Sequence, residues 1–248
     1  MKLLRFIVAI TKGVILIILM IIFLSFYSLS LLVSKDSPKR AFRLRRNYIR
    51  FAFFFLNVKL EKEGQMHDGP ALYICNHRSF IDPIIVCRYV DAYIIAKAEV
   101  ASMPVLNTGA KFTGIIYVKR ESRDSRHAAR EMMSSTIQGG HNVLVFPEGT
   151  IASDPHTLPF RPGSFAEMAR LGIPIVPIAL EYQEDYSYWR TPSLFNHFIN
   201  HIGRWDIPCK MKIGAPIWDT DATVLKDKAE AWVNGELGKM QEGWSKVF

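Results

Sequence analysis

The chain has 248 residues, enough for one sizeable α/β domain with an appendage but too few for two domains of the usual size. A hydrophobic content of 49% exceeds the needs of a soluble enzyme, while 22% charged residues exclude a polytopic membrane protein. The net charge of +8 favours an anionic partner, which could be nucleic acid, a phospholipid surface or a phosphorylated substrate. Three cysteines in or beside apolar runs are typical of buried thiols in a reducing compartment, not of a disulfide or a zinc site.

The apolar excess is concentrated near the N-terminus. Residues Gly13–Val33 carry no charge, and a helix of this length, at about 1.5 Å per residue, reaches the thickness of a bilayer's hydrocarbon core. A cleaved signal peptide is one alternative, but the run is too long and no A-x-A-like site follows it. A helix that enters one leaflet and returns is another, because serines soften its second half and both flanks are basic. The sequence predicts a membrane helix and leaves spanning and re-entry open.

The next segment, Lys35–Leu56, predicts an amphipathic helix with a basic face and an apolar face. The cations are Lys39, Arg40, Arg43, Arg46 and Arg50, and the residues roughly opposite are Phe42, Ile49, Ala52, Phe53 and Leu56. We expect this helix to lie at anionic headgroups, in preference to packing on its own domain. Because these cations outnumber those before Gly13, the positive-inside tendency places the globular part on the cytoplasmic side of the inner membrane. Nucleic acid is excluded as a partner, since no nucleic-acid-binding motif accompanies the arginines.

From about residue 58, short β-type runs alternate with helical stretches, which predicts an α/β fold with a mixed central sheet flanked by helices. We therefore divide the chain into membrane-associated helices over residues 1–57 and an α/β domain over residues 58–248. Strands are predicted at Ala71–Cys75, Tyr93–Ala96, Ile115–Val118, Asn142–Phe146, Ile175–Leu180 and Lys210–Ile213. Helices are predicted at Pro83–Tyr89, Ser122–Ile137, Gly163–Leu171 and Ala222–Val247. Residues Glu184–Gly203 are predicted to form a long loop or irregular excursion near substrate or membrane.

The first candidate chemistry lies just after a predicted strand. The run Ala71–Cys75 ends at Asn76 and His77, and Asp82 follows five residues after His77, so a strand-to-helix loop should carry His77 to the sheet edge where ligands collect. Taken alone, Asp82 before Pro83 is more typical of a helix N-cap, and a lone histidine of a packed, hydrogen-bonded one. These roles are compatible, because a rigidly held carboxylate can fix the imidazole tautomer and stabilise the imidazolium that forms when histidine acts as a base.

The segment Asn76–Asp82 resembles the first motif of the glycerolipid acyltransferase family typified by 1-acylglycerol-3-phosphate acyltransferase. The other three motifs of the family are resembled, in order, by Gly114–Arg120, Phe146–Thr150 and Val176–Leu180. Lys97 and Phe160–Gly163 also fit the family's intervening pattern. The resemblance covers about residues 60–217, and four ordered matches are hard to obtain by chance.

The resemblance implies a direct acyl transfer. His77 would deprotonate the acceptor hydroxyl, which attacks the thioester of acyl-CoA or acyl carrier protein, while Asp82 orients the base. The implied partners are a lysophospholipid acceptor, the acyl donor as co-substrate and membrane phospholipids. No metal, cofactor or acyl-enzyme is implied, in agreement with the lack of a G-x-S-x-G serine elbow and of a zinc-type histidine cluster in the sequence.

The resemblance also assigns substrate-binding residues. Glu148 would bind the acceptor, the alternative being a strand-ending turn with Glu148 in solvent. A glycine at Gly149 lets backbone amides approach a phosphate or an oxyanion. Arg120 offers a fork of donors suited to the acceptor phosphate, the alternative being a surface arginine paired with Glu121 or Asp124. The remaining predicted substrate-binding residues are Thr150, Lys97 and Pro177, the last with a role limited to shaping the site.

One departure from the family pattern concerns the acceptor headgroup. Many phosphatidic-acid-forming members continue the third motif with Arg-Ser, whereas this chain has Ile151-Ala152-Ser153, which removes a cation next to the expected acceptor site. We expect acylation of 1-acyl-sn-glycerol-3-phosphate to phosphatidic acid. The alternatives are O-acylation of a lyso-ornithine lipid, a lyso-glycine lipid or another lysophospholipid, and a lipid-binding protein without catalysis, which has no need of a His-Asp pair.

Overall fold

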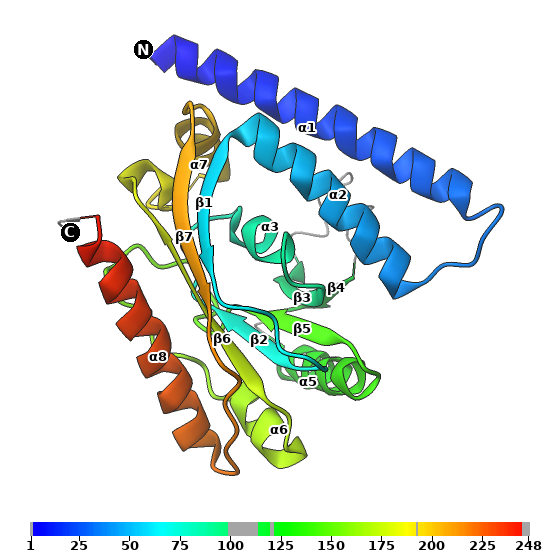
Figure 1. The fold of residues 1–248 in the computed structure, drawn as a ribbon, viewed down its shortest axis with the longest axis vertical. Coiled ribbons are helices and arrows are strands. Elements are labelled where there is room, and N and C mark those ends of the chain that lie inside the picture. Colours follow the sequence, from blue (N-terminus) through cyan, green and yellow to red (C-terminus); the bar gives the residue numbers. More distant parts are fainter. Residues whose placement is uncertain (1, 99–113, 120–121, 192, 245–248) are drawn as a thin grey trace.

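The computed structural model describes residues 2–98, 114–119, 122–191 and 193–244 (Figure 1). Within these residues the centre is a seven-stranded sheet in the order β1-β7-β6-β2-β5-β3-β4. The strands are β1 Val58–Glu63, β2 Leu72–Cys75, β3 Ala92–Lys97, β4 Ile115–Val118, β5 Asn142–Val145, β6 Ile175–Tyr182 and β7 Ile207–Ile213. The β6–β7 pair is antiparallel and the other five neighbouring pairs are parallel. The predicted mixed sheet is therefore confirmed.

The register of the central strands decides where a site can form. Strand β2 pairs in parallel with β5 on one side and with β6 on the other. All residues of β2 and β6 are buried, as expected for strands covered on both faces. Since the three strands run the same way, their carboxyl ends meet at one edge of the sheet. The segments that follow β2 and β5, which begin at Asn76 and Phe146, leave the sheet beside each other.

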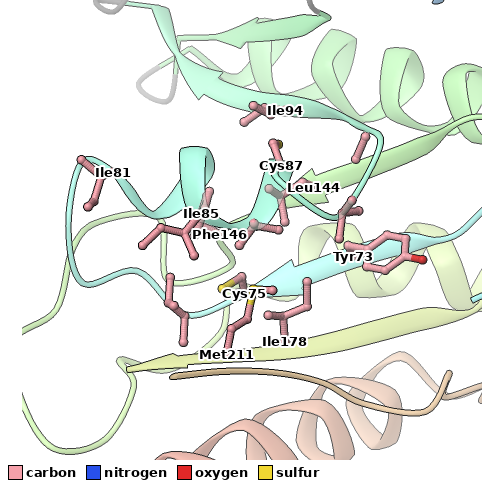
Figure 2. Packing of buried hydrophobic residues seen from close by; sticks show 14 of the residues in the cluster. Tyr73, Cys75, Ile81, Ile85, Cys87, Ile94, Leu144, Phe146, Ile178 and Met211 are labelled. Atoms are coloured by element: carbon pink, nitrogen blue, oxygen red, sulfur yellow. The ribbon is translucent and has the colours of Figure 1, made fainter. Parts of the chain in front are cut away.

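Helices cover both faces of the sheet. They are α2 Pro38–Leu56, α3 Asp82–Cys87 and α7 Leu194–Ile202 on one face, and α5 Arg123–Gln138, α6 Gly163–Leu171 and α8 Ala222–Glu242 on the other. Alternation along β2 explains the two cores, because Tyr73 and Cys75 enter the first and Leu72 and Ile74 the second. In Figure 2, side chains of α3 point down toward Cys75, with neighbours from β5, β6 and β7. All three cysteines are buried and unpaired, as predicted.

Helix α1, Lys2–Ser30, lies outside the α/β layers. Among the described helices it is the one long and apolar enough to cross a membrane, judged by length and composition only. It packs lengthwise on α2 and α7 (Figure 1). Its other side exposes the apolar residues Leu3, Leu4, Phe6, Ile7, Ile10, Val14, Ile17, Ile18, Ile21, Ile22, Phe26 and Leu29. Thus one face of α1 belongs to the protein, and the opposite face is available to a membrane.

The predicted amphipathic helix corresponds to α2, but the expected place of its apolar face is wrong. Phe42, Ile49, Ala52 and Leu56 are buried, and Ile49 and Leu56 belong to the core that also contains α3. The helix begins after Ser37, whose side chain accepts from a backbone N–H of the first turn. The apolar face therefore packs on the protein's own domain, because the sheet and α3 leave an apolar surface there to cover.

Three element predictions need correction. Residues predicted as a long loop contain a 3₁₀ turn at Asp185–Ser187 and the helix α7, capped by Ser193. Their aromatic and polar composition conceals a helix whose polar histidines face inward. Strand β1 was not predicted, because all six of its residues are partly or fully exposed and four of them are charged, as is typical of an edge strand. Helix α8 ends at Glu242, where Gly243 forms the C-cap, and residues 245–248 lie outside the described part of the chain.

Candidate active site

The two residues that resemble a catalytic pair meet at the sheet edge. His77 Nδ1 lies 2.7 Å from Asp82 Oδ2. The Asp82 side chain is fully buried, while 18% of the His77 side chain is exposed. The loop between them brings the pair together because β2 ends at Cys75 and α3 begins at Asp82. The imidazole is thus the member of the pair that can reach a substrate.

Asp82 does not serve as the predicted N-cap. Ile81 occupies the cap position of α3, and Asp82 is the first residue of the helix. Its carboxylate turns back toward the loop, where Oδ2 accepts from the backbone N–H groups of Arg78 at 2.6 Å and Ser79 at 2.8 Å. The carboxylate thus accepts from amides of the loop and not from amides of the first helical turn. The same Oδ2 also contacts the His77 imidazole.

A fourth donor completes the surroundings of Asp82. The hydroxyl of Tyr182, at the end of β6, donates to Oδ1 at 2.6 Å. Burial, followed by the neighbouring Asp82 charge, raises the pKa of Tyr182 well above its usual range, so this hydroxyl keeps its proton. Four donors thus converge on the buried carboxylate and hold it rigidly. With Nδ1 donating to Asp82, His77 Nε2 is the nitrogen that can accept a proton.

Residues of the third motif hold His77 from the opposite side. The His77 ring stacks on Phe146 with ring centroids 4.3 Å apart. The His77 backbone N–H donates to Glu148 Oε1 at 2.7 Å, and Glu148 Oε2 accepts from the N–H of Leu158 at 2.9 Å. Glu148 is only 3% exposed, so the alternative that places it in solvent is wrong. Burial raises the pKa of Glu148, an effect that the two N–H donors oppose.

The turn after β5 brings a cation close to the third motif. Gly149 has φ +71°, and a Cβ there would lie 2.4 Å from Nε of Arg161, which crosses the turn. The N–H of Gly149 donates to the carbonyl of Phe146 at 3.1 Å, so this amide is engaged within the turn. Thr150 follows as an exposed residue. Glycine is required here for the approach of the Arg161 side chain.

The other predicted substrate-binding residues are not gathered around His77 to the same degree. Lys97 is half-buried and ends β3, separated from β2 by β5. Pro177 is buried within β6, where it pairs with Ile74. Arg120 lies outside the described residues. Among the described residues, no group of three or more His, Cys, Asp and Glu side chains could hold a metal ion.

Comparison with known proteins decides the family. The family model described as acyltransferase matches residues 57–181, half of the chain. The chain belongs to the acyltransferase family. A relative is the chloroplastic 1-acyl-sn-glycerol-3-phosphate acyltransferase BAT2 of Brassica napus, 26% identical over 72% of this chain and 50% of that protein. Another is the lyso-ornithine lipid O-acyltransferase of Rhodobacter capsulatus, 26% identical over 60% of this chain and 57% of that protein.

The chain spans only about half the length of these acyltransferase relatives. The crystal structure of the 1-acyl-sn-glycerophosphate acyltransferase PlsC from Thermotoga maritima matches with a TM-score of 0.68 at 20% identity. The match covers 94% of this chain and 98% of that one. The α/β architecture with its N-terminal helices is therefore the fold of that acyltransferase.

A buried arginine of the first acyltransferase motif was not singled out from the sequence. Arg78 is fully buried, and its guanidinium donates to the carbonyls of Ala152, Asp154 and Pro155 and lies 3.3 Å from Glu181 Oε2. The arginine therefore fixes the segment that follows the third motif against the first. The local sequence gives no signal for this role of Arg78, because its partners lie more than seventy residues away.

Proposed function

We propose that the protein transfers a fatty acyl group from acyl-CoA or acyl carrier protein to the free hydroxyl of 1-acyl-sn-glycerol-3-phosphate, which makes phosphatidic acid. The observation that carries this proposal is the 2.7 Å contact between His77 Nδ1 and Asp82 Oδ2 at the sheet edge, with the imidazole partly exposed. Membership of the acyltransferase family supports the reaction class. The proposed site comprises His77 and Asp82 as catalytic residues, with Glu148 and Gly149 beside them.

The geometry supports general-base catalysis. His77 Nε2 takes the proton of the acceptor hydroxyl as its oxygen attacks the thioester carbonyl. The tetrahedral intermediate collapses, the C–S bond breaks, and the imidazolium returns the proton to the leaving thiolate, which yields the ester and a free thiol. Asp82 keeps Nδ1 protonated and stabilises the imidazolium while it exists. The acyl group passes directly from sulfur to oxygen, and no bond to the protein forms.

Recognition of the acceptor phosphate is assigned to two arginines. Arg161 crosses the Gly149 turn beside Glu148, where it replaces the cation that Ile151-Ala152-Ser153 lacks. Arg120 is assigned from the second motif. A guanidinium presents paired donors that suit a phosphate. Lys97 and Thr150 are kept as weaker members of this substrate-binding set, and Pro177 as a residue that shapes the strand.

The acceptor is a membrane lipid, and the chain carries a surface that suits a membrane. The exposed face of α1 is apolar over most of its length, while the other face packs on α2 and α7. We place α1 in the plane of the cytoplasmic leaflet of the inner membrane, with the α/β part in the cytoplasm. Helix α2 packs beside α1, and its exposed basic residues Lys39, Arg43 and Arg50 suit anionic headgroups.

A second candidate function is O-acylation of a lyso-ornithine lipid. The Ile151-Ala152-Ser153 sequence and the Rhodobacter capsulatus relative favour it. The catalytic pair would act in the same way on either acceptor, because both present a hydroxyl. The two candidates differ in the headgroup, since the lyso-ornithine lipid lacks the phosphate that Arg161 and Arg120 would bind.

An assay of the purified protein in lipid–detergent micelles tests the proposal. Lysophosphatidic acid, lyso-ornithine lipid and lysophosphatidylethanolamine are each offered with acyl-CoA and with acyl carrier protein. We expect turnover of lysophosphatidic acid, lowered roughly 10²- to 10⁴-fold by His77→Ala with little change in melting temperature. Turnover confined to lyso-ornithine lipid would transfer the assignment to the second candidate, and no turnover of any acceptor would reject acyl transfer.

The same assay separates the headgroups with an arginine variant. Arg161→Ala should lower kcat/KM for lysophosphatidic acid by about 10- to 150-fold, the equivalent of one charge-assisted hydrogen bond, and should leave the donor KM unchanged. Arg170→Ala is the matched control, because Arg170 is an exposed arginine of α6 paired with Glu167. An equal effect of the two substitutions would remove Arg161 from the acceptor site.

A further inference from the structure

Behind Asp82 lies a buried polar cluster formed by Ser79, His197 and His201. Ser79 Oγ lies 3.1 Å from His197 Nε2 and 3.0 Å from His201 Nδ1. All three residues are at most 2% exposed. Both histidines belong to α7, which begins beyond residue 181, where the acyltransferase family model ends.

The hydrogen-bonding capacity of the cluster fixes its proton arrangement. Burial lowers the pKa of His197 to about 4 and that of His201 well below its usual range, so both rings are neutral. His201 Nε2 is buried without a partner among the described residues. An unpaired lone pair costs less than an unpaired N–H, which assigns the proton of His201 to Nδ1. His201 then donates to Ser79 Oγ, and the Ser79 hydroxyl donates to His197 Nε2.

The same serine is joined to the catalytic carboxylate through its backbone. The N–H of Ser79 donates to Asp82 Oδ2 at 2.8 Å, and this is the oxygen that receives His77 Nδ1. A rotation of the Ser79 peptide would therefore move a donor away from Oδ2 and change the alignment of the carboxylate with the imidazole. Because a serine side chain alone is free to rotate, the two histidines supply the restraint.

The residues on both sides of Ser79 are held by the same part of the chain. The carbonyl of Arg78 accepts from the N–H of Trp189 at 3.0 Å. Phe80 packs edge-on against His197, with ring centroids 5.4 Å apart. Trp189 in turn stacks on His197 at 5.3 Å. Three consecutive residues of the catalytic loop are thus anchored to the segment that ends in α7.

Helix α7 is itself fixed from outside by α1. A Cβ at Gly203, the C-cap of α7, would lie 2.5 Å from the carbonyl oxygen of Arg5, so the two helix backbones are in direct contact. Lys12 Nζ donates to the carbonyl of Arg204 at 2.7 Å, and Phe195 packs against Phe6. The cluster therefore rests on a helix that cannot shift without displacing α1.

We propose that His197 and His201 are positioning residues for the His77–Asp82 pair, acting through Ser79. They touch neither substrate nor base, and they fix the loop whose amides orient the Asp82 carboxylate. The inference rests on the proposed acyl transfer for its kinetic effects. Its structural effect, a shorter and better aligned contact between Asp82 and His77, exists in the protein without substrate.

The test uses paired substitutions that remove or retain each hydrogen bond in the full-length protein. His201→Leu and His197→Leu replace each histidine with an apolar side chain of similar size, which cannot form the hydrogen bond to Ser79. His201→Asn offers an amide N–H near the position of Nδ1, and His197→Gln offers an amide oxygen near Nε2. His127→Leu is the control, because His127 is exposed on α5 and far from the cluster in the fold.

Two readouts separate positioning from a merely structural role. We expect His201→Leu and His197→Leu to lower kcat by about 10- to 100-fold at unchanged KM for donor and acceptor. The acidic limb of the kcat/KM profile should move to lower pH, because a misaligned Asp82 stabilises the imidazolium less. His201→Asn and His197→Gln should restore kcat and the pH of the acidic limb toward those of the parent, and His127→Leu should change neither quantity. The downfield proton resonance of the His77 Nδ1–H, recorded without substrate, should move upfield in the two leucine variants.

The outcomes distinguish this inference from the proposed function. Folded leucine variants with an unchanged Nδ1–H resonance would overturn the positioning role, whatever acceptor the protein uses. A lower melting temperature without movement of the resonance or of the pH profile would likewise make the cluster structural only. A parent protein that turns over no lysolipid, yet shows the shifted resonance in the leucine variants, would reject the proposed function and retain the positioning role.

Discussion

Glu148 ties two loops of the candidate site together from within the protein. Its two carboxylate oxygens accept from the backbone N–H groups of His77 and Leu158, which lie on different segments. Two opposing effects act on this group, since burial favours the protonated acid and the two donors favour the carboxylate. Burial is the larger, so the pKa of Glu148 is raised above its ordinary value near 4.5.

The direction of this shift predicts how Glu148 affects stability across pH. Since folding favours the protonated acid, its contribution is fully present below about pH 4.5 and is lost as the pH rises through the folded pKa. Glu148→Gln removes the titration. We therefore expect the unfolding free energy of the parent, minus that of Glu148→Gln, to fall as the pH rises from about 4 to 7. Urea unfolding in a single detergent, monitored by tryptophan fluorescence, measures this difference in unfolding free energy. A difference that rises with pH would mean that the two donors outweigh burial.

At the scale of residues, motif spacing singled out His77, Asp82 and Glu148, and the structure brings these three residues into contact. Motif spacing could not identify the hydrogen-bond donors that hold these side chains. Tyr182 is a hundred residues from Asp82 in the chain. Nothing in the sequence of its strand indicates that this residue lies beside the Asp82 carboxylate. The cap interpretation of Asp82 failed for a related reason. Local sequence places a carboxylate near a helix start, whereas the tertiary fold decides which amides it accepts from.

Among the elements, α2 shows most clearly how one pattern permits two placements. Its alternating basic and apolar sectors fit a membrane interface and a domain surface equally well. The structure assigns the apolar sector to the domain, since Ile49 and Leu56 enter the core below it. Phe51 and Phe54 remain exposed on the outside of the helix, close to Arg50, so a smaller aromatic and basic surface is still available to lipid.

Paired alanine substitutions distinguish the two faces of α2. Ile49→Ala should lower the unfolding free energy by about 2 to 5 kcal/mol, because it removes a buried side chain. Phe54→Ala should change it by less than about 0.5 kcal/mol, since Phe54 is 78% exposed. Urea unfolding gives the first quantity, and co-sedimentation with anionic vesicles gives membrane affinity. If Ile49→Ala left stability intact and weakened vesicle binding, the packed face would be assigned wrongly.

The elements that sequence patterns missed share a physical cause. Helix α7 buries two histidines where an amphipathic pattern would require apolar residues, so the segment looks polar although its inner face is buried. Four of the six residues of strand β1 are charged, because at a sheet edge little apolar surface needs covering. In contrast, β2 and β6 are covered on both faces, and continuous apolar runs identified them. Burial by apolar contacts leaves a sequence signal, and burial by polar networks does not.

For the whole molecule, the packing of α1 on α2 and α7 limits how the protein can associate with a membrane. The helix has 29 residues, so at about 1.5 Å per residue it is about 43 Å long, more than the thickness of a hydrocarbon core. Its contacts with the protein run from Arg5, whose backbone meets Gly203 at the end of α7, to Ser30, whose hydroxyl accepts from Arg40 of α2. A helix that spanned the bilayer in this packing would carry α2 and α7 into the hydrocarbon with it. The charges of α2 disfavour that placement, which supports the proposed orientation of α1 in the plane of one leaflet.

This orientation predicts that both ends of α1 lie on the same side of the membrane. Lys2→Cys and Ser34→Cys introduce thiols at the two exposed ends, and the native cysteines are buried and react slowly. Asp227→Cys, at an exposed position of α8, reports the side of the globular part. In sealed inner-membrane vesicles, a membrane-impermeant maleimide should label all three variants in inside-out preparations and none in right-side-out ones. A spanning helix would instead give Lys2→Cys and Asp227→Cys opposite patterns, because a single crossing separates the first residue of the helix from everything that follows it. Labelling of Ser34→Cys and Asp227→Cys in inside-out vesicles, without labelling of Lys2→Cys, would therefore disprove the in-plane helix.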